Sequence, residues 1–147
     1  MSANEGKILE KYKIQVGETS YIFLDVPLEI SPIGKWVLSY GKVQEMMKSV
    51  AALILADKEK MLTFAELEHL AKTAEMSMAK IAELIKISRS AITKWKNIEG
   101  HIPYTDSYCL KDKLPKIIFD FEGRKDDAED RADFWISKAS LPRPAVA

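Results

Sequence analysis

The stretch SMAKIAELIKISRSAITKWKN, residues 77–97, decides the fold that the sequence predicts. It contains two short helical patterns on either side of a tight turn at residues 86–88. In the second pattern Ala91, Ile92 and Trp95 are spaced to form one apolar side, and polar side chains occupy the rest. This spacing predicts a helix that packs through one side and leaves hydrogen-bonding groups free on the other.

Each part of a helix-turn-helix motif has a suitable residue in this stretch. Ala82 is small where the two helices would touch, Ile87 is apolar in the turn, and Ile92 is an apolar anchor inside the second helix. Ser88 can cap the second helix, because its hydroxyl can accept a hydrogen bond from the amide of Ala91. We therefore expect a helix-turn-helix, the motif that places its second helix in the major groove of DNA.

The exposed side of this second helix carries groups that can donate to phosphates or base edges. These residues are Arg89, Ser90, Thr93, Lys94 and Lys96. Arg89 and Ser90 lie at the N-terminal end, which such motifs insert deepest into the groove. The plainer alternative is that the basic side chains only form a solvated helix face. Trp95 is expected in the core, with a base-stacking platform as the alternative.

The segment from about residue 62 to residue 103 also resembles the lambda-repressor/Cro-like (XRE) helix-turn-helix family. The matching motifs are IAE at residues 81–83, ISRSAI at residues 87–92, and WKN at residues 95–97, with Gly100 and Pro103 after it. The resemblance implies that Arg89, Ser90 and Lys94 face the bases. It also implies that Ser77, Ser88 and the loop at residues 100–102 meet the phosphate backbone. The complete set of predicted DNA-binding residues is Ser77, Lys80, Ser88, Arg89, Ser90, Thr93, Lys94, Lys96, Asn97 and His101.

The sequence departs from the family pattern at two positions. Lys86 occupies the turn position that is usually glycine, where a positive φ is common, and a lysine there costs on the order of 1 kcal/mol. Met78 stands where the family often has a glutamine that bonds a phosphate. The second departure removes one expected contact with the DNA backbone and leaves the predicted fold unchanged.

The N-terminal part of the chain is predicted to form a β-hairpin. Apolar and polar residues alternate over residues 12–16, which is the two-residue period of a half-buried strand. A turn is expected at residues 17–19, and residues 21–26 are strongly β-prone. Pro27 and Pro32 end the pattern. Because a lone hairpin is marginally stable, it must pack on another element or pair with another chain.

Helical periodicity follows the hairpin over residues 40–58. Its apolar stripe consists of Val43, Met46, Met47, Val50, Leu53 and Ile54. Four of these residues, Met46, Met47, Val50 and Leu53, suit either the core or a dimer seam. Thr63 and Glu66 have the spacing of a capping box and predict the start of the next helix. After the central motif, residues 106–113 are predicted as a short helix that Pro115 stops, and residues 116–121 as a strand.

The end of the chain is predicted to form a helix at residues 126–139 and a disordered tail from residue 141. The acidic residues 126–130 are either a solvated helix face or a docking segment for a basic partner protein. The predicted organisation is a β-rich segment at 1–35, a linker and dimerisation helix at 36–60, a helix-turn-helix domain at 61–115 and a C-terminal extension at 116–147. The fold class is mainly α with a small N-terminal β-hairpin (α+β).

This layout resembles a second family, the MqsA-type antitoxins. The similarity consists of a β-rich N-terminal piece that ends in a Val-Pro step, a linker helix and then the helix-turn-helix. Those proteins carry a cysteine-bound zinc in the N-terminal piece, whereas this chain has no cysteine before Cys109. The resemblance is therefore to the architecture without the metal.

Composition excludes several classes of function. The 22 basic and 22 acidic residues give a net charge of +0, so DNA binding has to depend on a local basic patch. A single cysteine and two distant histidines, His69 and His101, argue against a metal site. The sequence contains no phosphate-binding glycine loop and no nucleophile-base pair, so no cofactor and no enzymatic activity are expected. The N-terminus lacks the apolar core of a signal peptide and no apolar run could span a membrane, so a cytoplasmic location is expected.

The sequence thus predicts a dimeric repressor that binds double-stranded DNA at two half-sites about one helical turn apart. Two alternatives remain. The protein could be an antitoxin that binds a toxin through the hairpin or the acidic segment and represses its own operon. It could also be a helix-turn-helix module that binds proteins and not DNA.

Overall fold

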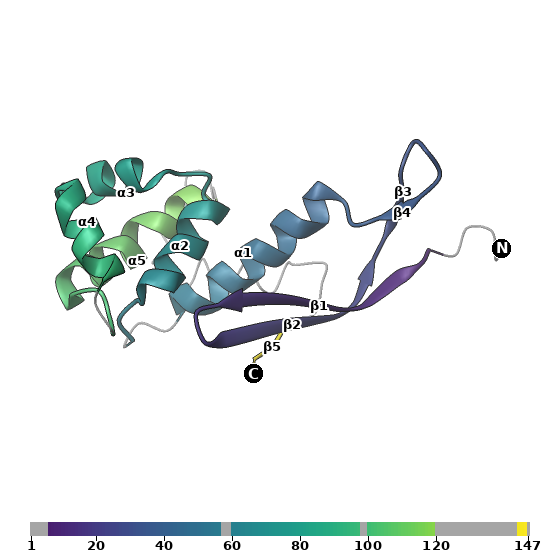
Figure 1. Ribbon diagram of the computed structural model, residues 1–147, viewed down its shortest axis with the longest axis horizontal. Coiled ribbons are helices and arrows are strands. Elements are labelled where there is room, and N and C mark those ends of the chain that lie inside the picture. The colour runs from purple at the N-terminus through teal and green to yellow at the C-terminus, as the bar shows by residue number, and fades with distance from the viewer. Residues whose placement is uncertain (1–5, 57–59, 98–99, 120–143, 147) are drawn as a thin grey trace.

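The computed structural model of the protein describes residues 6–56, 60–97, 100–119 and 144–146. Within these residues the fold is α+β, with two small antiparallel sheets and five helices. The elements are β1 (Ile8–Val16), β2 (Thr19–Pro27), β3 (Glu29–Ile30), β4 (Trp36–Val37), α1 (Tyr40–Ala56), α2 (Phe64–Thr73), α3 (Met78–Ile85), α4 (Arg89–Lys96), α5 (Tyr104–Ile118) and β5 (Ala145–Val146). Figure 1 shows α2–α5 grouped at one end of an elongated molecule, with the β1–β2 hairpin running alongside α1.

The predicted β-hairpin is confirmed, and its turn requires glycine. Antiparallel β1 and β2 pair Tyr12 with Phe23 and Val16 with Thr19. Gly17 has a φ of 60°, and a Cβ atom added there would lie 3.2 Å from the Cβ of Ala65 at the start of α2. The hairpin turn therefore packs closely against α2. A lone hairpin is marginally stable, and this contact with a helix helps to stabilise it.

The alternation of buried and exposed side chains in β2 shifts by one residue at Asp25. Tyr21 and Phe23 are buried, as strict alternation demands, but Leu24 and Asp25 are both exposed and Val26 is buried again. Asp25 has a φ of 54°, a left-handed conformation that aspartate tolerates better than a β-branched residue does. Residues 21–26 are a continuous β-prone run in the sequence, so this shift was not predicted.

Three further strands, β3, β4 and β5, were also not predicted. β3 and β4 form a second, two-stranded sheet next to the start of α1. At the end of the chain, where disorder was expected, β5 pairs with β2 through Tyr21 and Ile22. The predicted helix at residues 126–139 and the acidic residues 126–130 lie outside the described residues.

Helix α1 begins where the periodicity predicted, and its buried face is wider than the predicted stripe. Met46 and Val50 are 0% exposed in the single chain, so they belong to its own core and not to a dimer seam. Ala51, Ala52 and Leu55 are buried as well, although they are absent from the predicted stripe. Small residues at two of these positions let α1 approach its neighbours closely from more than one side.

Helix α2 starts with the predicted capping box. The amide of Glu66 donates to the hydroxyl of Thr63 over 3.1 Å, and the amide of Thr63 donates to the carboxylate of Glu66 over 2.9 Å. Two backbone donors that the helix cannot satisfy internally thus find partners.

The predictions that Pro115 ends a short helix and that residues 116–121 form a strand are wrong. Helix α5 continues through Pro115 to Ile118, and the amide of Phe119 still donates to the carbonyl of Pro115 over 3.0 Å. Proline removes one helical hydrogen bond. Pro115 is buried together with Leu114 and Ile118, and this burial stabilises the last turn despite that loss.

His69 joins α2 to α1 inside the protein. It is 9% exposed, and its Nε2–H donates to the carbonyl of Met47 over 2.9 Å. Burial lowers the pKa of the imidazole, the bond to Met47 acts in the opposite direction, and the charge of Lys72 lowers it further. The folded protein therefore holds this histidine neutral at a pH where the unfolded chain is protonated.

We expect the free energy of unfolding to decrease as the pH is lowered through the window in which only the unfolded chain binds this proton. That window begins at the ordinary histidine pKa of 6.5 and extends down to the lowered pKa of His69. Within this window, each unit of pH decrease should lower the unfolding free energy by at most about 1.4 kcal/mol because of His69. Urea unfolding between about pH 7.5 and about pH 5.5 measures this slope. The variant His69→Gln should show a flatter profile, and an equally steep one would contradict the assignment.

Two general features bear on function. No helix among the described residues is long and apolar enough to cross a membrane. Within the same residues no three His, Cys, Asp or Glu side chains are grouped so that they could hold a metal ion.

Candidate nucleic-acid interface

Helices α3 and α4 pack on the core through short apolar faces. Ile81, Ala82 and Ile85 are buried on α3, and Ile92 and Trp95 are buried on α4. Trp95 is 6% exposed, so it is a core residue and not a surface for base stacking. Because α4 has only eight residues, these two anchors determine which side of the helix faces outward.

The turn between the helices has the hydrogen bonds of a Schellman motif. The amide of Ile87 donates to the carbonyl of Ala82 over 3.0 Å, and the amide of Lys86 donates to the carbonyl of Glu83 over 3.3 Å. Lys86 adopts φ 57° and ψ 48°, the left-handed conformation that suits glycine. The hydroxyl of Ser88 then accepts from the amide of Ala91 over 3.2 Å and caps α4, as the sequence predicted.

Replacing Lys86 with glycine should make the protein more stable. The left-handed conformation costs a residue with a Cβ about 1–2 kcal/mol, and part of this gain is lost because glycine frees the unfolded chain. We expect Lys86→Gly to raise the unfolding free energy by about 0.5–1 kcal/mol in urea titrations. Lys86→Ala keeps the Cβ and should stay within about 0.5 kcal/mol of the wild type. A destabilised Lys86→Gly variant would contradict this interpretation.

The outward side of α4 is polar along its whole length. Its exposed residues are Arg89, Ser90, Thr93, Lys94 and Lys96, followed by the exposed cap Asn97. Successive residues of a helix are about 100° apart, so Ser90, Thr93 and Asn97 share the centre of this side. Arg89 and Lys96 lie along one flank of that centre, and Lys94 lies along the other.

The neutral side chains of this surface are already bonded within the chain. Ser90 Oγ lies 2.9 Å from Ser88 Oγ, and Thr93 Oγ1 donates to the carbonyl of Arg89 over 3.1 Å. Asn97 Nδ2 donates to the carbonyl of Thr93 over 3.3 Å. By contrast, the side chains of Arg89, Lys94 and Lys96 make no hydrogen bond or ion pair with any residue that the structure describes. The donors available to an outside partner are therefore mainly the cations.

A shallow hollow between α3 and α4 brings three predicted residues together. Ser77, Lys80 and Arg89 line it, with Glu83 and Ile87 among their neighbours. The Ser77 hydroxyl accepts from the amide of Lys80 and so caps α3. The ion pair from Lys80 to Glu83 measures 3.8 Å and is exposed on both sides, so it holds Lys80 only weakly.

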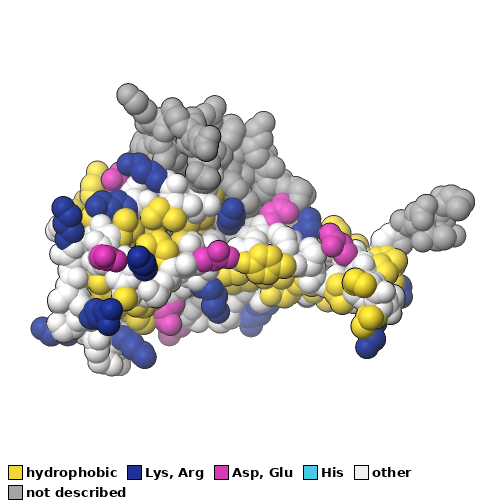
Figure 2. Space-filling model, turned by 90° about the horizontal axis from the view of Figure 1, so that it is seen from above, with side chains coloured by type: hydrophobic (Ala, Val, Ile, Leu, Met, Phe, Trp, Pro, Cys, Tyr) yellow, Lys and Arg dark blue, Asp and Glu magenta, His cyan; other side chains and the backbone are white. Residues whose placement is uncertain are grey.

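This part of the surface is basic although the chain as a whole is neutral. Residues 77–97 contain five Lys or Arg and one Glu, which gives a local charge of +4. Figure 2 shows several Lys and Arg side chains at the end of the molecule that the helices form. A local patch of this kind attracts polyanions without making the whole protein basic.

Several predicted residues lie near the N-termini of α3 and α4, and His101 does not belong to that group. It is exposed, and it follows the C-terminal end of α4, whereas Arg89 stands at the other end. Its backbone forms an isolated bridge with Thr63, and the next amide, of Ile102, donates to the carbonyl of Leu62 over 2.7 Å. This pairing ties the loop before α5 to the start of α2. Residues 98–99 of the same loop lie outside the described residues.

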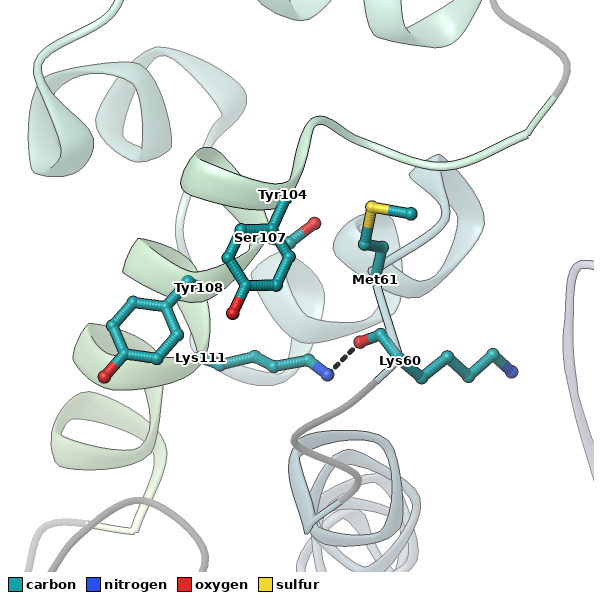
Figure 3. A pocket seen from close by; sticks show the side chains of 6 residues that line it. All are labelled: Lys60, Met61, Tyr104, Ser107, Tyr108 and Lys111. Atoms are coloured by element: carbon teal, nitrogen blue, oxygen red, sulfur yellow. Dashed lines mark hydrogen bonds between the residues drawn. The ribbon is translucent and has the colours of Figure 1, made fainter.

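A pair of exposed tyrosines on α5 was not predicted (Figure 3). Tyr104 and Tyr108 are each 65% exposed, and their rings stack with centroids 6.4 Å apart. They border a crevice beside Met61, where the Nζ of Lys111 donates to the carbonyl of Lys60. Its free volume of about 10 Å³ is roughly the space of one water molecule, so the crevice is no ligand pocket. The spacing of four residues between the tyrosines is the signal that could have indicated the pair.

Comparisons of the chain with known protein families, characterised proteins and solved structures yield no match. Membership of the Cro-like family therefore stays a prediction.

Proposed function

We propose that the protein binds double-stranded DNA through α3 and α4, which act as a Cro-like helix-turn-helix, and that it represses transcription. The observation that carries this proposal is the division of α4 into two sides. Its apolar side is fixed to the core through Ile92 and Trp95, and its cationic side is exposed. A buried outer side would have excluded this function.

In the proposed complex the N-terminal end of α4 enters the major groove. The guanidinium of Arg89 is free of partners among the described residues and can donate two hydrogen bonds to a guanine. Lys94 and Lys96 extend from opposite flanks of α4, so they suit phosphates on the two sides of a groove. Ser77, Ser88 and Lys80 lie beside the same end of α4, where backbone amides at helix N-termini favour phosphate groups.

A symmetric dimer of this protein would place two copies of α4 in successive major grooves. The centres of the two half-sites would then be about one helical turn of DNA apart. The bound dimer would exclude RNA polymerase by occupying the promoter, a mechanism that needs no cofactor and no catalytic residue.

The proposal is tested by titrating the protein with duplex DNA from the region upstream of its own gene. We expect affinity to fall by a factor of about 10 or more between about 50 mM and about 200 mM salt, because each neutralised phosphate releases counterions. Lys13→Ala removes an exposed cation on β1 and serves as a matched control with unchanged affinity. A protein that binds no duplex at any salt concentration would instead be a protein-interaction module.

A second candidate function, that of an antitoxin, is favoured by the N-terminal sheets. Among the described residues β1 pairs with β2 alone, so its other edge is open to a strand from another protein. Ile30 and Ile33 on the β3–β4 hairpin are 59% and 77% exposed. Co-expression with the product of an adjacent open reading frame tests this function. We expect relief of a toxicity that the adjacent product causes alone, and relief that survives Arg89→Ala.

A further inference from the structure

We infer that Thr93 contacts the methyl group of a thymine, so that a T·A pair lies under the middle of α4 in the preferred site. This inference rests on the proposed DNA-binding function and names one base that the protein would select.

Thr93 occupies the centre of the outward side of α4. It lies one turn after Arg89 and is exposed, while the adjacent Ile92 is buried in the core. Arg89 and Lys94 extend on either side of it. Attraction of these two cations to the DNA backbone and bases brings the centre of α4 close to the floor of the groove.

The hydroxyl group of Thr93 is engaged inside the helix. Its Oγ1 donates to the carbonyl of Arg89 over 3.1 Å, so the proton that could have been donated to a base is used. Ser90 and Asn97, the other two residues of the central line, are likewise bonded within the chain. The parts of Thr93 that remain free are its methyl group and the acceptor lone pairs of Oγ1, and the methyl group is its only free apolar surface.

A methyl group on a protein matches one feature of the major groove. Among the four bases only thymine presents an apolar group there, its C5 methyl, and the other edges present hydrogen-bond donors and acceptors. A cytosine or a purine under this methyl group would place polar edge atoms against an apolar surface. Thr93 therefore favours thymine without any hydrogen bond to the base.

The experiment replaces each thymine of the bound duplex in turn with deoxyuridine, which removes the methyl group and nothing else. At one position per half-site we expect the wild-type affinity to fall about fourfold, the effect of losing one buried methyl group. Thr93→Ser keeps the hydroxyl and loses the methyl, so it should bind thymine and uracil duplexes equally. Thr93→Val keeps a methyl and loses the hydroxyl, so it should discriminate like the wild type.

The possible results separate this inference from the proposed function. Binding of duplex DNA with equal affinity for every deoxyuridine duplex would overturn the inference and leave the proposed function standing. Undiminished discrimination by Thr93→Ser would also overturn it. A wild-type protein that binds no duplex would overturn both. Circular dichroism of the two variants verifies that α4 is folded in each.

Discussion

Replacing Trp95 with alanine is expected to lower the free energy of unfolding by about 3–5 kcal/mol. The side chain is 6% exposed and, together with Ile92, holds α4 on the core. Its loss removes a large apolar surface and leaves a cavity that a helix of eight residues cannot close by shifting. Urea unfolding followed by circular dichroism measures the change.

The neighbouring residue provides the control for this prediction. Lys96 is exposed, so Lys96→Ala should change stability by less than about 0.5 kcal/mol. If Trp95 were a stacking platform for bases, Trp95→Ala would weaken DNA binding and leave stability unchanged. A Trp95→Ala variant within about 1 kcal/mol of the wild type would contradict the packing that the structure shows.

Arg89→Ala is expected to cost about 1–3 kcal/mol of discrimination at one base pair in each half-site. Arg89 stands at the N-terminal end of α4, and its guanidinium has no partner among the described residues. In a gel-shift titration the variant should bind the preferred duplex less well. For duplexes in which that base pair is changed, the variant and the wild type should have almost equal affinity.

Lys96→Ala is the matched comparison, because it removes a cation from the same flank of α4 at the other end of the helix. A contact with phosphate carries no sequence information, so this variant should weaken binding to all duplexes by a similar factor. The slope of the logarithm of its affinity against the logarithm of the salt concentration should also be shallower by about 1. If both variants bound every duplex like the wild type, the proposed docking of α4 would be wrong.

The parts of the fold that could be predicted from the sequence depend on local interactions. The cap at Ser88 and the capping box of Thr63 and Glu66 each involve residues three apart, and the structure contains both. The alternation at residues 12–16 likewise predicted a strand of the hairpin. In each case the residues that determine the element are close together in the chain.

The parts that could not be predicted depend on distant contacts. Pro115 is a strong local signal for the end of a helix, yet burial of Leu114 and Ile118 in the core extends α5 past it. β5 forms only because Tyr21 and Ile22, more than a hundred residues earlier, offer it a strand edge. Burial of a whole chain segment outweighs a single lost hydrogen bond.

In the candidate interface, too, the features that follow from local spacing could be predicted and those that depend on other contacts could not. The helical period alone predicted which residues of α4 would be exposed, because Ile92 and Trp95 determine the opposite side. The bonds of Thr93 and Asn97 to carbonyls one turn earlier depend on side-chain rotamers, which periodicity does not determine. The position of His101 depends on pairing with Thr63, a residue far away in the sequence.

The most direct test of the central claim, that the outward side of α4 enters a DNA groove, is a nitrogen–proton NMR spectrum of the labelled protein titrated with duplex DNA from its upstream region. We predict that the largest shifts fall on amides of residues 77–80 and 88–97, and that amides of β1 and β2 are unaffected. Shifts confined to the β1–β2 hairpin or to α1, or a spectrum that the duplex leaves unchanged, would contradict the account.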